Sequence, residues 1–342
     1  MAVCQSQAWH CSAIARSCEK LENVKRTLVR SVVIAASSSA GVTSAVMPTV
    51  IRRLKKLDRL DRPNARSSHK LPTPRGGGLA CAVGVVAGLA SARAVGLPVP
   101  MTVTAGVLGM AALGYIDDRV SLSATVRLGG QVVSGAAAGA LLGGTVPAIA
   151  AGAVVVPVAV NSFNFMDGIN GISAGQIAVW AGSTVPHLVA TGAVGELSIV
   201  ASVLGAGLSF LPWNVPEARV FLGDVGSYLF GSAIAFVTLS RFVRREGTLG
   251  VLVAPYSLYL ADTGWTLLRR FRSGKRLTDA HRDHVYQALS DLKGIEHWQV
   301  AAGVAGSGAV CAVLARKSGA ALGIPAILAG YLSSPFFLSR AS

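Results

Sequence analysis

Long stretches without a charged side chain are the feature that most restricts how this chain can fold. The longest, residues 128–166, has 39 consecutive positions without Lys, Arg, Asp or Glu. A membrane-spanning helix needs about 20 mostly apolar residues, so this stretch predicts two helices, with the reversal near Gly144 and Pro147. Other stretches of span length occupy residues 31–51, 76–92, 94–116, 168–195, 197–215, 225–240, 247–268 (which includes Asp262), 299–315 and 318–339. The expected fold class is all-α, a polytopic integral membrane protein with about 10 to 11 transmembrane helices.

Charged residues are few, and most of them are basic. The 342 residues include 31 Lys or Arg and 16 Asp or Glu, a formal net charge of +15 and a charged share of 14%, against roughly 25% in an ordinary soluble domain. The mean hydropathy is +0.55. These values exclude a disordered chain, a typical soluble enzyme and a histone-like nucleic-acid binder. We therefore expect a lipid bilayer as partner and no nucleic acid.

The basic residues predict the orientation of the chain. Residues 52–75 contain nine Lys or Arg side chains, which places this connection in the cytoplasm by the positive-inside rule. Residues 1–30 are polar and lack the apolar core of a signal peptide. We expect them to form a polar N-terminal tail, followed by one multi-span domain over residues 31–339. Counting alternate connections places five of them on the cytoplasmic face: residues 52–75, 117–127, 161–172, 214–224 and 269–298.

Acidic residues recur in these connections. Asp117 and Asp118 are adjacent, and adjacent carboxylates repel each other unless a cation or base neutralises them; their hard oxygens suit Mg²⁺. The alternative is a solvated loop in which they pair with Arg119 or Arg127. Asp224 lies between glycines at the start of a later apolar stretch, where a helix N-cap is the alternative role.

Two further polar segments interrupt the apolar pattern. Residues 161–171 include three Asn residues, Asp167 and two glycines. We expect irregular backbone here that lines a cavity and whose N–H groups approach an anion, with a purely structural break as the alternative. His281, Arg282 and His284 form a basic cluster suited to pyrophosphate. A zinc site is the rival interpretation, but the cluster lacks Cys partners and the H-E-x-x-H pattern.

Together these segments resemble the polyprenyl-phosphate N-acetylhexosamine-1-phosphate transferases, also called glycosyltransferase family 4. The matching blocks run in family order: residues 62–78, 114–119, 161–171, 221–227, Asp262 with residues 269–270, and residues 279–284. The resemblance implies a Mg²⁺-dependent enzyme, with Mn²⁺ as an alternative, that transfers sugar-1-phosphate from a UDP-sugar to undecaprenyl phosphate and releases UMP. It implies a bacterial inner (plasma) membrane protein with its active site on the cytoplasmic face. We also expect that the chain can form a homodimer.

The same resemblance assigns roles to individual residues. Asp117, Asp118 and Asp167 are the expected catalytic residues, with Asp117 deprotonating or positioning the lipid phosphate. Asp224 and Asp167 are the expected metal ligands, and Phe221 is expected to stack near the uridine. The expected substrate-binding residues are Lys70, Asn164, Asn170, Asn214, Phe221, His281, Arg282 and His284.

The subtype and two other function classes stay open at this point. Residues 281–287 most resemble the subgroup that initiates O-antigen or related surface polysaccharides, often on N-acetylated 6-deoxyhexosamines. The first alternative is a secondary transporter for an anionic lipid or nucleotide sugar, for which the intramembrane Asp262 is the one supporting feature. The second is a catalytically inactive scaffold in a polysaccharide assembly complex.

Overall fold

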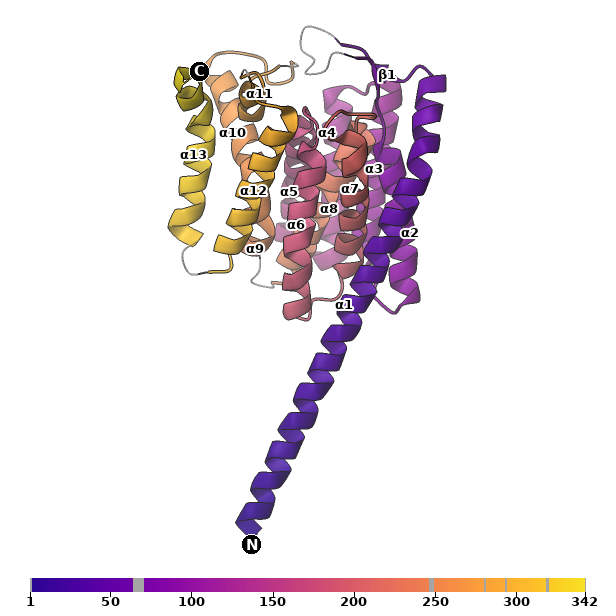
Figure 1. Cartoon of the computed structure of the whole chain (residues 1–342), viewed down its shortest axis with the longest axis vertical. Coiled ribbons are helices and arrows are strands. Elements are labelled where there is room, and N and C mark those ends of the chain that lie inside the picture. Colours follow the sequence, from indigo (N-terminus) through magenta and orange to yellow (C-terminus); the bar gives the residue numbers. More distant parts are fainter. Residues whose placement is uncertain are drawn as a thin grey trace.

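The computed structural model describes residues 2–63, 71–245, 249–279, 281–292, 294–317 and 320–341. These residues form a helical bundle, from which the N-terminal part of the first helix projects at one end (Figure 1). One short antiparallel pair of two-residue strands, β1 (Leu60–Asp61) and β2 (Thr73–Pro74), lies at the other end. The all-α prediction is confirmed.

Most of the helices follow one another with short connections; the long ones are residues 57–77 and 273–284. Their bounds are α1 Ala2–Lys56, α2 Gly78–Ala94, α3 Met101–Val120, α4 Ala124–Gly143, α5 Val146–Met166, α6 Ile172–Ala190, α7 Leu197–Asn214, α8 Gly223–Val243, α9 Leu249–Val253, the 3₁₀ turn η1 Ala254–Tyr256, α10 Ser257–Arg272, α11 Val285–Ser290, α12 His297–Leu314 and α13 Ala320–Ala341.

Several of these helices have the length and composition of membrane spans. Among the described residues, five qualify: Glu22–Lys56 within α1, and α5, α7, α8 and α12; α2 and part of α13 are shorter apolar helices. The five spans and the shorter apolar helices together support a multi-pass membrane protein. The helix α1 begins at Ala2. The backbone of the expected N-terminal tail is therefore helical from this residue on.

The predicted reversal within residues 128–166 is confirmed. The helix α4 ends at Gly143, and Gly144 takes a left-handed conformation with φ of 64°, which glycine adopts without steric cost. Thr145 then caps α5 by accepting a hydrogen bond from Ala148 N at 3.3 Å.

The expected single span at residues 247–268 is wrong in detail. The segment breaks at η1, which contains Pro255, because proline cannot donate the helical hydrogen bond. Neighbouring side chains bond the carbonyls at the break: Gln176 Nε2 donates to Pro255 O at 2.9 Å, and Trp180 Nε1 donates to Leu252 O at 3.0 Å. Such partners are what an irregular backbone needs inside a membrane.

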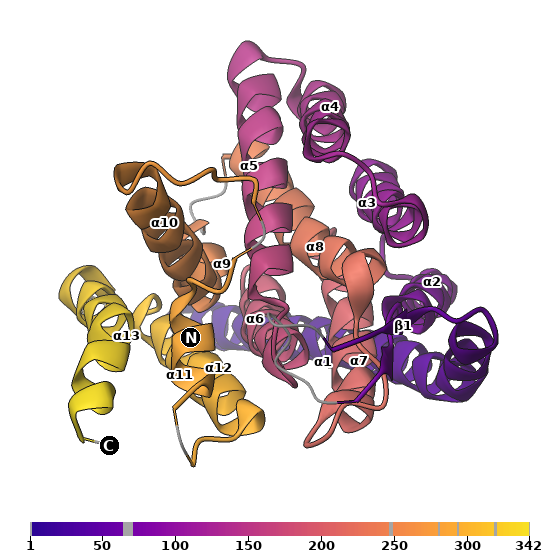
Figure 2. The ribbon, with the colours of Figure 1, turned by 90° about the horizontal axis from the view of Figure 1, so that it is seen from above.

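The helix α8 is the centre of the bundle (Figure 2). Of its 21 residues, 19 are buried, from Gly223 to Arg241, which is typical of a helix that is covered on every side. It packs against α3, α5 and α2. The N-terminus of α8 therefore lies where several other helices end, and it is the reference point for the site.

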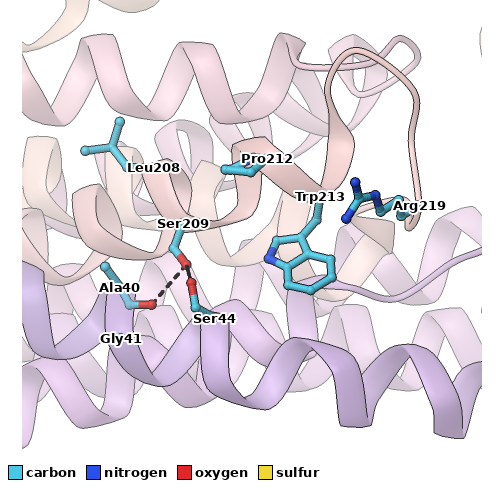
Figure 3. Close-up of a pocket in the computed structure, with 8 residues that line it drawn as sticks. All are labelled: Ala40, Gly41, Ser44, Leu208, Ser209, Pro212, Trp213 and Arg219. Atoms are coloured by element: carbon cyan, nitrogen blue, oxygen red, sulfur yellow. Dashed lines mark hydrogen bonds between the residues drawn. The ribbon is translucent and has the colours of Figure 1, made fainter.

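Polar contacts between helices fasten α1 to α7 (Figure 3). Ser44 Oγ and Ser209 Oγ are 2.7 Å apart, and Ser209 Oγ donates to Ala40 O at 2.9 Å. A surface groove of about 540 Å³ runs along this contact, with Trp213 and Arg219 at one end. The Arg219 guanidinium lies 5.9 Å from the Trp213 ring centroid, a cation–π distance.

Candidate active site

Arg75 joins two of the predicted acids at the N-terminus of α8. Its Nη2 donates to Asp224 Oδ1 at 2.8 Å, and its Nε lies 3.4 Å from Asp118 Oδ1. Asn164 Nδ2 donates to the same Asp224 oxygen at 2.8 Å and to Ser227 Oγ at 3.0 Å. Arg75 therefore meets residues of three helices at one point: Asp118 of α3, Asn164 of α5 and Asp224 of α8.

The carboxylate of Asp118 also anchors α8. Its two oxygens accept hydrogen bonds from the backbone N–H groups of Asp224 and Val225, each at 3.0 Å. These groups have no intrahelical partner, and a negative charge at this end of a helix is favourable. Asp118 of α3 therefore caps α8, and Asp224, whose alternative role was the N-cap, is the second residue of the helix.

Two glycines allow this close approach. A Cβ at Gly114 of α3 would lie 2.2 Å from Asp224 O, and a Cβ at Gly78 of α2 would lie 2.3 Å from Gly226 Cα. Neither distance can accommodate a carbon atom, so both helices reach α8 because these positions carry no side chain.

Asp117 faces a different set of partners from its neighbour. Its Oδ1 accepts from Leu122 N at 2.8 Å, and its Oδ2 accepts from Arg127 Nη1 at 3.1 Å and from Tyr228 OH at 3.3 Å. The carboxylate is 4% exposed. The alternative to a metal site was a solvated loop in which the acids pair with arginine. The pair with Arg127 is present, but Asp117 is buried and not solvated.

The segment expected to be irregular is helical for most of its length. The helix α5 continues to Met166, and the non-helical part is confined to residues 167–171. Asp167 follows the helix, and its Oδ1 accepts from Ser173 Oγ at 2.6 Å. Loss of water raises the pKa of Asp167 to about 7, and Asp224 and Asp118 add to the rise, whereas Ser173 and Arg75 oppose it.

The connection between α7 and α8 is held by hydrogen bonds that involve three predicted substrate-binding residues, Asn214, Asn170 and Phe221. Asn214 accepts from Gly171 N at 2.6 Å and donates to Val220 O at 3.1 Å. Asn170 Nδ2 donates to Pro216 O at 3.0 Å. Phe221 pairs through its backbone, donating to Pro74 O at 2.8 Å. All three hold the connection between α7 and α8 in place, and their expected contacts with substrate stay predictions.

The basic cluster lies before α11. The rings of His281 and His284 stack with centroids 5.1 Å apart, and Arg282 Nη2 donates to Asp291 Oδ1 at 2.6 Å. Burial lowers the pKa of His281 to about 4, as do the nearby His284 and Arg270, whereas Asp283 opposes this shift. His281 is therefore neutral at pH 7.

A largely apolar cavity of about 890 Å³ connects the cluster to the helices. Its lining includes the polar side chains of Arg127, Asn164, His281 and His284 together with apolar side chains of α5 and α10. Cavities of this kind, with a few convergent polar groups, are typical of ligand sites. Lys70 lies outside the described residues.

The structure adds residues that were absent from the expected site: Arg75, Arg127, Tyr228 and Ser173. Arg75 and Arg127 had a signal in the sequence, because clustered carboxylates need positive partners. Tyr228 and Ser173 lie in apolar helices and carry no such signal.

The donor set can be compared with the needs of Mg²⁺. Across the described ranges, no group of three or more His, Cys, Asp or Glu side chains forms a ready metal site. The Oδ2 atoms of Asp224 and Asp167 accept no hydrogen bond from the described residues. Mg²⁺ is commonly held by one or two carboxylates together with substrate phosphates, and this pair fits that arrangement.

Comparison with known proteins identifies the family of the chain. Residues 100–241 match the model of glycosyl transferase family 4. The chain is 32% identical over 276 residues to the phospho-N-acetylmuramoyl-pentapeptide-transferase of Moorella thermoacetica, covering 70% of this chain and 84% of that protein. It is 27% identical over 284 residues to a probable undecaprenyl-phosphate N-acetylglucosaminyl 1-phosphate transferase of Bacillus subtilis, covering 78% of this chain and 79% of that protein.

A third relative is the decaprenyl-phosphate N-acetylglucosaminephosphotransferase of Mycobacterium tuberculosis, 26% identical over 326 residues, which cover 80% of this chain and 78% of that protein. These relatives span most of the described bundle and carry names of one enzyme class. The chain therefore belongs to glycosyl transferase family 4, the polyprenyl-phosphate N-acetylhexosamine-1-phosphate transferases, and is a phosphotransferase.

Proposed function

We propose that this protein transfers the sugar-1-phosphate of a UDP-sugar to undecaprenyl phosphate, releasing UMP and leaving a lipid-pyrophosphoryl sugar. The sugar is an N-acetylhexosamine or a 6-deoxy derivative, and the product starts a surface polysaccharide such as O-antigen. One observation carries the proposal: the acid cluster around Arg75 lies beside a cavity of about 890 Å³ that joins apolar helix surface to Arg127, His281 and His284. A polyprenyl phosphate has a long apolar chain and an anionic head, which match the apolar and the basic lining of this cavity.

Each charged group has a definite task in this proposal. Arg127 lines the cavity and is held by Asp117, so the pair positions the lipid phosphate for attack. Arg75 keeps Asp118 and Asp224 together. Phosphoryl transfer needs in-line positioning and charge neutralisation more than covalent help, and these residues supply positioning.

We include Mg²⁺ in the proposal, with Mn²⁺ as a substitute. Asp224 and Asp167 would hold the ion through their unbonded oxygens, together with substrate phosphates. When bound, the cation would neutralise the diphosphate and stabilise the departing UMP.

The proposed setting is the bacterial inner membrane, crossed about 10 to 11 times, with the acid cluster on the cytoplasmic side and a homodimer as the assembly. The basic residues before β2 support this side. Cysteine labelling from each face of sealed vesicles tests it: a residue introduced beside Asp58 should react from the cytoplasmic face, and reaction from the other face would reverse the topology.

The activity test uses membranes that contain the protein. With undecaprenyl phosphate, Mg²⁺ and either UDP-GlcNAc or a UDP-6-deoxyhexosamine, they should release UMP. Asp117→Asn and Asp224→Asn should abolish turnover, and full activity in both variants would refute the site assignment. Vesicle uptake of substrate without UMP release would favour a transporter instead. Asp262 was the feature that favoured a transporter. In the structure, its carboxylate is hydrogen-bonded to other residues of the protein.

A further inference from the structure

Asp262 of α10 has no assigned role, yet it is fully buried, at 0% exposure. Its Oδ1 lies 2.9 Å from His284 Nδ1 and accepts from Val285 N at 3.1 Å. Its Oδ2 accepts from Tyr286 N at 3.2 Å and from Tyr331 OH at 2.7 Å. A buried carboxylate is costly unless it is hydrogen-bonded throughout, and this one has donors on both oxygens.

The contact with His284 determines the chemistry of that ring. An ionised carboxylate is an acceptor and has no proton to donate, so the nitrogen that faces Asp262, Nδ1, carries hydrogen. The other nitrogen, Nε2, is then the atom left for a ligand. The carboxylate orients the imidazole so that Nε2 is the nitrogen away from Asp262, and an Nε2–H can donate to an anionic oxygen.

His284 lies at the cavity in which a substrate phosphate would bind. It is 3% exposed and lines the cavity of about 890 Å³, as do Arg127 and Asn164. The Phe165 ring lies 6.1 Å from it on one side, and the His281 ring stacks at 5.1 Å. These ring contacts and the hydrogen bond to Asp262 restrict rotation of the imidazole.

We propose that Asp262 is a positioning residue that presents His284 Nε2 to a substrate phosphate, and that Tyr331 of α13 completes the device by holding Asp262. The C-terminal helix is thereby part of the catalytic unit, although the family match covers residues 100–241 and Tyr331 lies 69 residues from Asp262 in sequence. The inference rests on the proposed function for the identity of the phosphate, which belongs either to the lipid or to the nucleotide sugar.

The experiment is a double-mutant cycle, because Asp262 variants can fail to fold. His284→Asn keeps an N–H at the position of Nδ1 and removes Nε2. Tyr331→Phe removes one hydroxyl that touches Asp262. If Tyr331 acts through His284, Tyr331→Phe should lower kcat/KM by about three- to tenfold in the natural protein and have no further effect in the His284→Asn background.

Tyr256→Phe is the matched control. Tyr256 is also buried, and its hydroxyl donates to Ala159 O at 2.8 Å, away from Asp262. Its effect on kcat/KM should be the same in both backgrounds. Equal effects of Tyr331→Phe in both backgrounds would overturn the inference, because they would show a general structural role.

A second measurement separates this inference from the proposed function. The same cycle is repeated on the Kd for undecaprenyl phosphate and on the Kd for UDP-GlcNAc, in detergent micelles without turnover. Coupling in the first Kd identifies the lipid phosphate, and coupling in the second identifies the nucleotide diphosphate. Absence of UMP release would refute the proposed function, whereas additive effects in both Kd values would refute the positioning role.

Discussion

Replacing Gly114 by Ala tests whether the α3–α8 contact assembles the site. The new Cβ would lie 2.2 Å from Asp224 O, and real Cβ contacts essentially never fall below 3.0 Å. The helices must therefore separate by about 0.8 Å, the difference between those two distances. The bonds from Asp118 to the α8 N-terminus, now 3.0 Å, would lengthen beyond hydrogen-bonding distance.

The expected losses follow from that displacement. Overpacking of a tight contact costs about 1 to 3 kcal/mol of unfolding free energy, and a displacement of about 1 Å at a catalytic group can lower the rate about 100-fold. We would measure UMP release and the thermal unfolding midpoint in the same detergent. Gly109→Ala is the control, because it lies on the same helix with no atom within 4 Å of the added Cβ. Equal activity and equal midpoints for the two variants would refute the reasoning.

Three further predictions concern single ionisable groups. Asp118→Asn should lower the unfolding free energy by about 1 to 3 kcal/mol, because its NH₂ group would face a backbone N–H, whereas Asp58→Asn, which breaks an exposed pair with Arg62, should leave the midpoint unchanged. Arg75→Lys should lower kcat/KM at least about tenfold, since a point-like ammonium lacks the separate, fixed Nε–H and Nη2–H groups that contact Asp118 and Asp224; unchanged kinetics would show that charge alone suffices. His281 has its pKa lowered from 6.5 to about 4, so the folded state binds fewer protons than the unfolded state between these values and stability should fall as pH falls through them. Thermal unfolding of His281→Gln should show a weaker dependence on pH in that window, and an identical dependence would contradict the assignment.

The helical, multi-pass character of the chain was predictable because its signal is local. A stretch without charge needs no distant partner to be recognised, and the reversal at Gly144 is determined by residues beside it. The break at Pro255 has a local signal, but proline also lies inside the unbroken helices α5 and α7. The partners of the exposed carbonyls, Gln176 and Trp180, are 79 and 72 residues away.

In the candidate site, too, some features have a local signal in the sequence and others depend on distant contacts. The sequence alone indicated Asp117, Asp118, Asp167 and Asp224, because acids are scarce in this chain and stand out against apolar surroundings.

Their separate tasks depend on tertiary contacts. Asp118 bonds a backbone N–H that is 106 residues away, Arg75 reaches Asp224 across 149, and Tyr331 reaches Asp262 across 69. Residue type and spacing determine which side chains can carry charge at the membrane surface. The packing of helices around glycines such as Gly114 decides which of those charges meet, because hydrogen bonds and ion pairs act over a few ångströms and the sequence does not contain that distance.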